Sequence, residues 1–198
     1  MPNTYFWRKL HSFLGLFPIG VFLFEHMFVN SLALKGEAAF NRGVAFLQGV
    51  PYLWLVELVL IFLPLLFHAF YGIYIVYLTK NNVLSYTYFR NWLFYLQRIT
   101  ALVTLAFVAW HVFVLRLGFS GEISYAAVSQ TLSNPVVTAL YVIGLFASFS
   151  HFANGTWSFF VSWGITIGER AQKTTAYICA ILFVFLTVVG LKALNAFV

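Results

Sequence analysis

Residues 52–79 read YLWLVELVLIFLPLLFHAFYGIYIVYLT, a run with one charged residue, Glu57, and one histidine, His68. About 20 apolar residues are enough for a helix to cross the hydrocarbon core of a bilayer. Leu, Ile, Val and Phe fill the run without the alternation of a barrel strand, so it predicts a transmembrane helix. This segment decides the fold because the rest of the chain repeats its character.

Four more apolar segments are long enough to span a membrane, namely 11–34, 96–117, 136–163 and 174–197. Short connections separate the five segments and hold most of the polar residues, namely 35–51, 80–95, 118–135 and 164–173. We therefore predict an all-α membrane protein, a five-transmembrane-helix bundle that forms a single domain over residues 1–198.

The composition excludes a soluble protein. Charged residues make up 8% of the chain and hydrophobic residues 62%, whereas soluble domains carry about 25% charged residues. The basic residues are scattered at segment ends, which does not form the basic stripe of a nucleic-acid site, so we expect no nucleic-acid partner. A single cysteine, Cys179, excludes a Cys-x-x-Cys-His attachment of haem.

Lys and Arg residues predict the orientation of the chain in the membrane. Seven lie at the N-terminus and in the 80–98 and 164–173 regions, against four on the opposite side. Because basic residues concentrate on the cytoplasmic side, we expect the N-terminus in the cytoplasm and the C-terminus outside.

Four of the five histidines lie inside predicted spans, one in each of the first four, namely His26, His68, His111 and His151. An unpaired imidazole in hydrocarbon costs several kcal/mol, so such residues are rare and usually functional. One of them alone is readily explained as a hydrogen-bond partner between helices. Four, on four consecutive helices, indicate a binding function.

Depth sorts these histidines into two pairs. At a rise of about 1.5 Å per residue, His26 and His111 fall in the outer half of the membrane, and His68 and His151 in the inner half. Each level offers two ligands, which suits the axial positions of a haem iron but is too few for a tetrahedral zinc site. We therefore predict two stacked b haems, an outer one on His26 and His111 and an inner one on His68 and His151.

Other residues are candidates for contacts with the predicted haems. Haem propionates need cations or hydroxyls, and the candidates at the inner edge are His11, Ser12, Arg98, Arg170 and Lys173. His11 is too near the interface to be a ligand in the membrane core, and an ordinary interfacial role for it is equally open. Small residues on the ligand faces leave room for a flat macrocycle or serve helix packing, namely Gly72, Gly144, Ala147 and Gly155.

Glu57 is the most informative acidic residue. It precedes His68 by eleven positions, close to three helical turns, which predicts that both side chains share the inward face of one helix. A carboxyl group at that depth suggests proton handling or a ligand contact. A carboxyl that reaches outward from the start of the helix is the equally simple alternative.

The N-terminal third resembles the dihaem cytochrome b subunit of bacterial succinate dehydrogenases, the Bacillus-type enzymes most closely. The residues that carry the resemblance are Arg8-Lys9-Leu10-His11-Ser12-Phe13-Leu14-Gly15, Glu25-His26, Asn30 and Gly36-Glu37-Ala38-Ala39-Phe40-Asn41. Length, five spans and histidine placement extend it over essentially the whole chain.

The resemblance implies a membrane subunit in the bacterial cytoplasmic membrane, not an enzyme on its own, that anchors a flavoprotein and an iron–sulfur protein. It implies electron transfer from succinate through the inner and outer haems to menaquinone, with His26, His68, His111 and His151 as iron ligands. We expect the quinone near the outer haem, with Glu57 as the candidate proton-exchanging group. Some related fumarate reductases carry a glutamate two residues before the fourth ligand, where this chain has Phe149; this favours succinate oxidation.

Three alternatives stay open at this point. The same architecture serves quinol:fumarate reductases. Another dihaem anchor, of the hydrogenase or formate dehydrogenase type, has similar spans and ligands. A transporter that relays protons through intramembrane histidines is a different class altogether.

Overall fold

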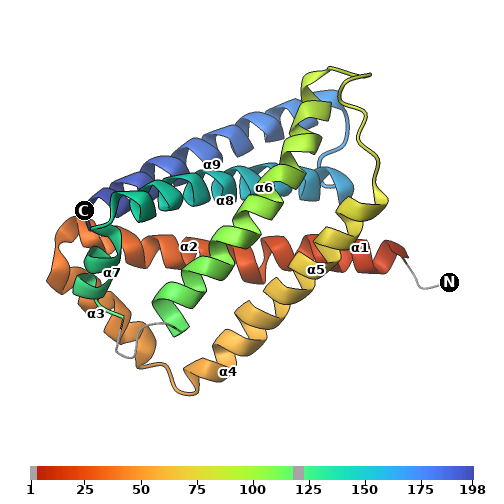
Figure 1. Ribbon diagram of the computed structural model, residues 1–198. Coiled ribbons are helices and arrows are strands. Elements are labelled where there is room, and N and C mark those ends of the chain that lie inside the picture. The colour runs from red at the N-terminus through yellow and green to blue at the C-terminus, as the bar shows by residue number, and fades with distance from the viewer. Residues whose placement is uncertain (1–3, 118–122) are drawn as a thin grey trace.

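The computed structural model describes residues 4–117 and 123–198, and the regular structure of these residues is all helical (Figure 1). Five helical stretches are long and apolar enough to cross a bilayer, namely Thr4–Lys35, Leu53–Leu78, Phe89–Arg116, Pro135–Ser162 and Glu169–Asn195. The predicted all-α class and the five predicted spans are confirmed.

The first three spans are built from more than one helical piece. The elements in chain order are α1 (Thr4–Leu16), α2 (Pro18–Ser31), a 3-10 turn (Leu32–Lys35), α3 (Glu37–Gln48), α4 (Leu53–Glu57), a π-helical turn (Leu58–Phe62), α5 (Leu63–Leu78), α6 (Phe89–Val112), a second π-helical turn (Phe113–Leu117), α7 (Tyr125–Leu132), α8 (Pro135–Ser162) and α9 (Glu169–Asn195). Proline begins α2 and α8, where its missing N–H costs no helical hydrogen bond.

Helices α1 and α6 begin at Thr4 and Phe89, seven residues before the predicted starts of the first and third spans. The additional turns mix aromatic residues with charged and amide residues such as Arg8 and Arg90. Such amphipathic ends lie at the membrane interface, and a search for apolar runs does not detect them.

Two connections predicted as loops contain helices. Helix α3 lies within 35–51 and α7 within 118–135, of which 118–122 lie outside the described residues. Both bury apolar residues against Tyr141 of α8 and the C-terminal Phe197. The main-chain N–H of Tyr125 also donates to Asn41 Oδ1 at 2.8 Å. The two helices therefore form a cap over the end of the bundle that holds the C-terminus, which Figure 1 shows opposite the N-terminus.

Four spans surround the centre of the bundle in the order α1–α2, α5, α6 and α8. Helix α1 packs against α5 and α8, and α6 packs along α8, while α5 and α6 approach each other at few positions. This order places α2 diagonally opposite α6 and α5 diagonally opposite α8. Helix α9 lies outside the four, against α8 and α2, where the small Gly190 lets the Phe149 ring pack closely.

Candidate functional site

The four predicted ligand histidines meet in two pairs across the diagonals of the bundle. The ring centres of His26 on α2 and His111 on α6 lie 5.8 Å apart, with the ring planes at 85°. The ring centres of His68 on α5 and His151 on α8 lie 6.2 Å apart, with the ring planes at 83°. The structure thus brings together the same partners that depth alone predicted.

These separations fit two imidazoles that share one metal. Two rings bound to a metal from opposite sides, each through a bond of about 2 Å, have their centres about 6 Å apart. Among the described residues, no three His, Cys, Asp or Glu side chains are arranged to hold a metal ion. Each level therefore offers two imidazoles, which is the number that a bis-histidine haem iron takes.

Hydrogen bonds to Nδ1 leave Nε2 available for a metal in three of the four paired histidines. The Nδ1 atom of His68 donates to the His11 carbonyl oxygen at 2.9 Å, and that of His151 donates to the Gln97 carbonyl oxygen at 3.1 Å. The Nδ1 atom of His111 lies 3.0 Å from the Tyr141 hydroxyl oxygen. A carbonyl oxygen only accepts, so Nδ1 of His68 and His151 carries the proton. Metal-binding histidines are generally oriented by such bonds.

The two pairs lie at separate levels of the bundle. A Cβ atom on Gly15 would lie 2.4 Å from Cε1 of His68, so glycine is required there and Gly15 marks the level of the His68–His151 pair. His26 follows Gly15 by eleven residues in the same span, which corresponds to about 16 Å along a helix. Two groups held at these levels are stacked along the bundle axis.

His11 lies against His68. The two rings stack at 4.1 Å between centres with their planes at 5°, and the main chain of His11 holds the His68 ring. For His11 the sequence left a propionate contact and an interfacial role open, and the structure adds a contact with the His68 ring. Ser12 follows His11 on α1, and a propionate contact stays a prediction for both residues.

Unpaired polar atoms on the ligand-bearing helices fit a bound haem. Within the described part of the chain, Arg98 Nη2, Thr104 Oγ1 and Ser148 Oγ are buried without a hydrogen-bond partner. Thr104 lies seven residues before His111 and Ser148 three before His151, so each shares a helix face with a ligand. Buried polar atoms need partners, and haem propionates are acceptors for such donors. Arg98 therefore keeps its place as a propionate candidate.

The structure does not bring Arg170 and Lys173 to the histidine pairs. Both are exposed near the start of α9, outside the four ligand-bearing spans, and Lys173 Nζ pairs with Glu169 Oε1 at 2.7 Å. Charge and sequence position suggested a propionate contact, but α9 packs on the outside of the bundle. A propionate contact of Arg170 and Lys173 stays a prediction that these positions do not support.

Glu57 forms an ion pair with Arg116 at the capped end of the bundle. Arg116 Nη2 lies 2.8 Å from Glu57 Oε2 and 3.2 Å from Oε1. The π-helical turn Leu58–Phe62 separates Glu57 from His68. A π-helical turn holds more residues than an α-helical one and rotates the face that follows it, so the prediction that three regular turns align Glu57 with His68 is wrong. The carboxylate instead links the start of the second span to the end of the third.

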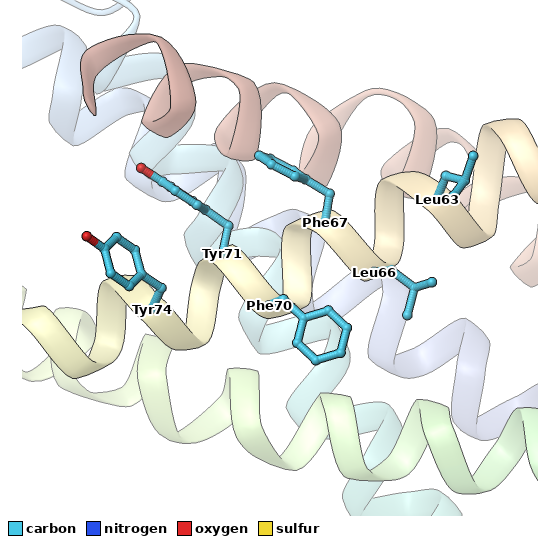
Figure 2. Close-up of a pocket in the computed structure, with 6 residues that line it drawn as sticks. All are labelled: Leu63, Leu66, Phe67, Phe70, Tyr71 and Tyr74. Carbon is cyan, nitrogen blue, oxygen red and sulfur yellow. The ribbon is translucent and has the colours of Figure 1, made fainter. Parts of the chain in front are cut away.

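An apolar groove of about 540 Å³ runs along α5, lined by Leu63, Leu66, Phe67, Phe70, Tyr71 and Tyr74 (Figure 2). Phe67 and Tyr71 point toward α1 in Figure 2, with their rings stacked at 5.5 Å. Tyr71 also contacts His11, at 5.8 Å between ring centres. Leu66 is 50% exposed and Phe70 is 68% exposed. We interpret the groove as a lipid-facing surface whose aromatic rings shield His11 and His68.

The small residues near His151 serve contacts between helices. A Cβ atom on Gly144 would lie 2.2 Å from the Phe107 ring, and one on Gly155 would lie 3.2 Å from Gln97 Nε2. These contacts favour the helix-packing alternative for the two glycines, and room for a macrocycle at them stays a prediction.

Sequence reasoning missed Gln97, Asn154 and Tyr141. Asn154 Nδ2 donates to Gln97 Oε1 at 2.8 Å, and Tyr141 is 6% exposed beside His111. The two amides carried a usable signal, since polar side chains inside apolar spans commonly pair across helices. Tyr141 carried none, because aromatic residues are frequent throughout these spans.

Fold and site together define a class, that of helical membrane proteins with paired histidines facing each other at two levels. The model of the succinate dehydrogenase/fumarate reductase transmembrane subunit family matches residues 83–190. The chain is also similar to the succinate dehydrogenase cytochrome b558 subunit of Bacillus subtilis (strain 168), with 44% identity over 198 residues, 99% of this chain and 98% of the relative. The chain belongs to the succinate dehydrogenase/fumarate reductase transmembrane subunit family. Membership removes the hydrogenase, formate dehydrogenase and transporter alternatives.

Proposed function

We propose that this chain is the membrane cytochrome b subunit of a succinate dehydrogenase, and that it passes electrons from the flavoprotein and iron–sulfur subunits to menaquinone by way of two b haems. The observation that carries the proposal is the pairing of His26 with His111 and of His68 with His151, each at the separation that axial ligands require. The name of the Bacillus subtilis relative, a cytochrome b558 subunit, agrees with haem b.

Each bound haem would supply an iron that accepts and releases one electron. The chain's own residues provide the rest. Carbonyl acceptors hold Nδ1 of His68 and His151, which leaves Nε2 of both residues free to bind the iron. Arg98 offers a free donor for a propionate. Apolar and aromatic side chains exclude water, and the distance of about 16 Å between levels keeps the two sites within one electron path.

The end of the bundle that holds the N-terminus is proposed to face the cytoplasm and to bind the iron–sulfur subunit. Seven of the eleven Lys and Arg residues lie at that end. The opposite end carries the α3–α7 cap. Amine-reactive cross-links from the iron–sulfur subunit should therefore reach Lys9, Lys80 or Lys173. Links mainly to Lys35 or Lys192 would invert the orientation.

The quinone is proposed to bind near the His26–His111 pair. Moving one charge across the membrane changes its free energy by about 2.3 kcal/mol per 100 mV. The membrane potential therefore favours electron movement toward the positive outer side and offsets an unfavourable transfer to menaquinone. Glu57 is the candidate proton-exchanging group at that end, and Arg116 holds its carboxylate. The direction of succinate oxidation agrees with Phe149, which is fully buried where a proton-path glutamate would stand.

Purification of the assembled complex tests the proposal. We expect two haems per chain, a b-type reduced-minus-oxidised spectrum, and copurification of a flavoprotein and an iron–sulfur protein that oxidise succinate. One haem per chain, or copurification without succinate oxidation, would contradict it. A complex that reduces fumarate with quinol faster than it oxidises succinate would favour the fumarate reductase alternative.

A further inference from the structure

Gln97 of α6 bonds to His151 of α8 at two points. Its carbonyl oxygen accepts from His151 Nδ1 at 3.1 Å, and its side-chain Nε2 donates to the His151 carbonyl oxygen at 3.0 Å. The ring and the main chain of one ligand are therefore both tied to one residue of the neighbouring helix. Such a double contact fixes the rotation of α8 about its axis, and its position along that axis relative to α6, at His151.

Asn154 completes the arrangement one turn further along α8. Its Nδ2 donates to Gln97 Oε1 at 2.8 Å and to the Leu93 carbonyl oxygen at 3.0 Å. The Gln97 amide thus has its oxygen and its nitrogen engaged at once, which leaves it a single orientation. Gly155 permits this approach, because a Cβ atom there would lie 3.2 Å from Gln97 Nε2.

We propose that Gln97, oriented by Asn154, is a positioning residue for the haem bound by His68 and His151. The proposal rests on the proposed two-haem function and extends it to residues outside the ligand set. The hydrogen bonds lie in a span where water does not replace a lost partner. The Gln97 carbonyl oxygen orients the His151 ring, as hydrogen-bond partners of metal-binding histidines generally do, and the Gln97 side chain fixes the position of that carbonyl against α8.

The two histidine pairs have different hydrogen-bond partners, so a substitution at Gln97 should affect only one of them. His111 is held by the Tyr141 hydroxyl, and the Gln97–Asn154 contacts reach only the His151 level. A change at Gln97 should therefore alter one haem and leave the other as an internal reference.

The test uses the complex with its partner subunits and measures haem content, absorbance spectra and midpoint potentials. His68→Ala and His26→Ala variants identify the spectrum of each haem. Gln97→Leu keeps the main-chain acceptor of His151 Nδ1 and removes the side-chain donor to the His151 carbonyl oxygen. We therefore expect haem loss on dilution to be about 2- to 10-fold faster at the His68–His151 site, with no change at the other site. In Gln97→Glu, the acceptor for Asn154 stays and the donor to His151 is lost. We therefore expect that haem to stay bound with a shifted spectrum and potential.

Thr156→Val is the matched control, since the Thr156 hydroxyl is buried on α8 and donates only to the Phe152 carbonyl oxygen of its own helix. It should leave both haems unchanged. If the complex that carries Gln97→Leu does not assemble, the Gln97→Glu variant tests the proposal instead. Unchanged spectra and potentials in Gln97→Glu, or equal shifts of both haems, would overturn this inference alone. A wild-type complex with a single haem would overturn the proposed function as well.

Discussion

The His68–His151 pair is held by main-chain acceptors, whereas the His26–His111 pair depends on a side chain. His68 and His151 donate to the carbonyl oxygens of His11 and Gln97. His111 contacts the hydroxyl of Tyr141. A substitution cannot delete a carbonyl group, but one substitution removes a hydroxyl. The two sites have similar ligand geometry and differ in how readily mutation alters their surroundings.

The surroundings of the two pairs differ in the same sense. The His26–His111 pair lies toward the α3–α7 cap and the Glu57–Arg116 ion pair. The His68–His151 pair lies toward the basic end, where Lys9 donates to the Ser162 carbonyl oxygen and Arg90 stacks on Trp157 at 3.3 Å. One end of the bundle is closed by the chain itself, and the other presents charged and aromatic groups to a partner. Substitutions at the two ends should therefore have separable effects.

Loss of a ligand gives the largest expected effect. His26→Ala and His111→Ala should each abolish the same haem, and His68→Ala and His151→Ala should each abolish the other one, because each iron then has one axial ligand in hydrocarbon. Haem quantification and low-temperature difference spectra provide the measurement. Identical spectra from His26→Ala and His68→Ala would contradict the pairing.

Glu57→Gln tests the capped end. The variant should slow quinone reduction by about 100-fold, because an amide does not donate a proton, while both haems and succinate-to-dye electron transfer remain. Arg116→Gln removes the ion pair and keeps the Glu57 carboxyl group. Equal slowing in that variant would show that the ion pair, and not proton donation by Glu57, is responsible. Glu37→Gln, exposed on α3 at the same end, serves as a control without effect. Unchanged quinone reduction in Glu57→Gln would move the quinone site to the opposite end.

Tyr141→Phe removes one hydroxyl and preserves the ring that packs against Phe107 and Trp110. Haem affinity at the His26–His111 site should fall by about 10-fold, with the other haem unchanged. Tyr125→Phe is the control, since its hydroxyl donates to the Ala196 carbonyl oxygen of the cap. Equal losses in both variants would indicate that the cap, not the contact with His111, is responsible.

His11→Ala gives the smallest expected effect. The His11 carbonyl oxygen stays in place, so His68 keeps its acceptor, and only the stacked ring is lost. Aromatic stacking contributes about 0.5–1.5 kcal/mol. The free energy of binding of the haem at the His68–His151 site, measured by thermal release, should therefore fall by about that amount while both haems remain bound. Complete loss of the haem would show that the side chain of His11, and not its main chain, holds the site.

Prediction from the sequence succeeded where hydrophobic length and depth were sufficient. The five spans and the pairing of His68 with His151 follow from apolar runs and residue counts, because helix rise is uniform. The same reasoning failed to place Glu57 relative to His68, because the sequence of Leu58–Phe62 does not predict the π-helical turn found there. Span order also does not reveal that the helix of Arg170 and Lys173 lies outside the four spans that carry the paired histidines.

By itself, the sequence determined that lipid is the solvent, that five helices cross it, and that four histidines lie at two depths, since these properties depend on local composition and a constant rise per residue. Only the tertiary structure decided the diagonal placement of the ligand helices, the carbonyl groups that orient His68 and His151, and the partner of Glu57. Main-chain acceptors belong to every residue type, so their use depends on how helices rotate against one another. That rotation is set by packing between segments far apart in the chain.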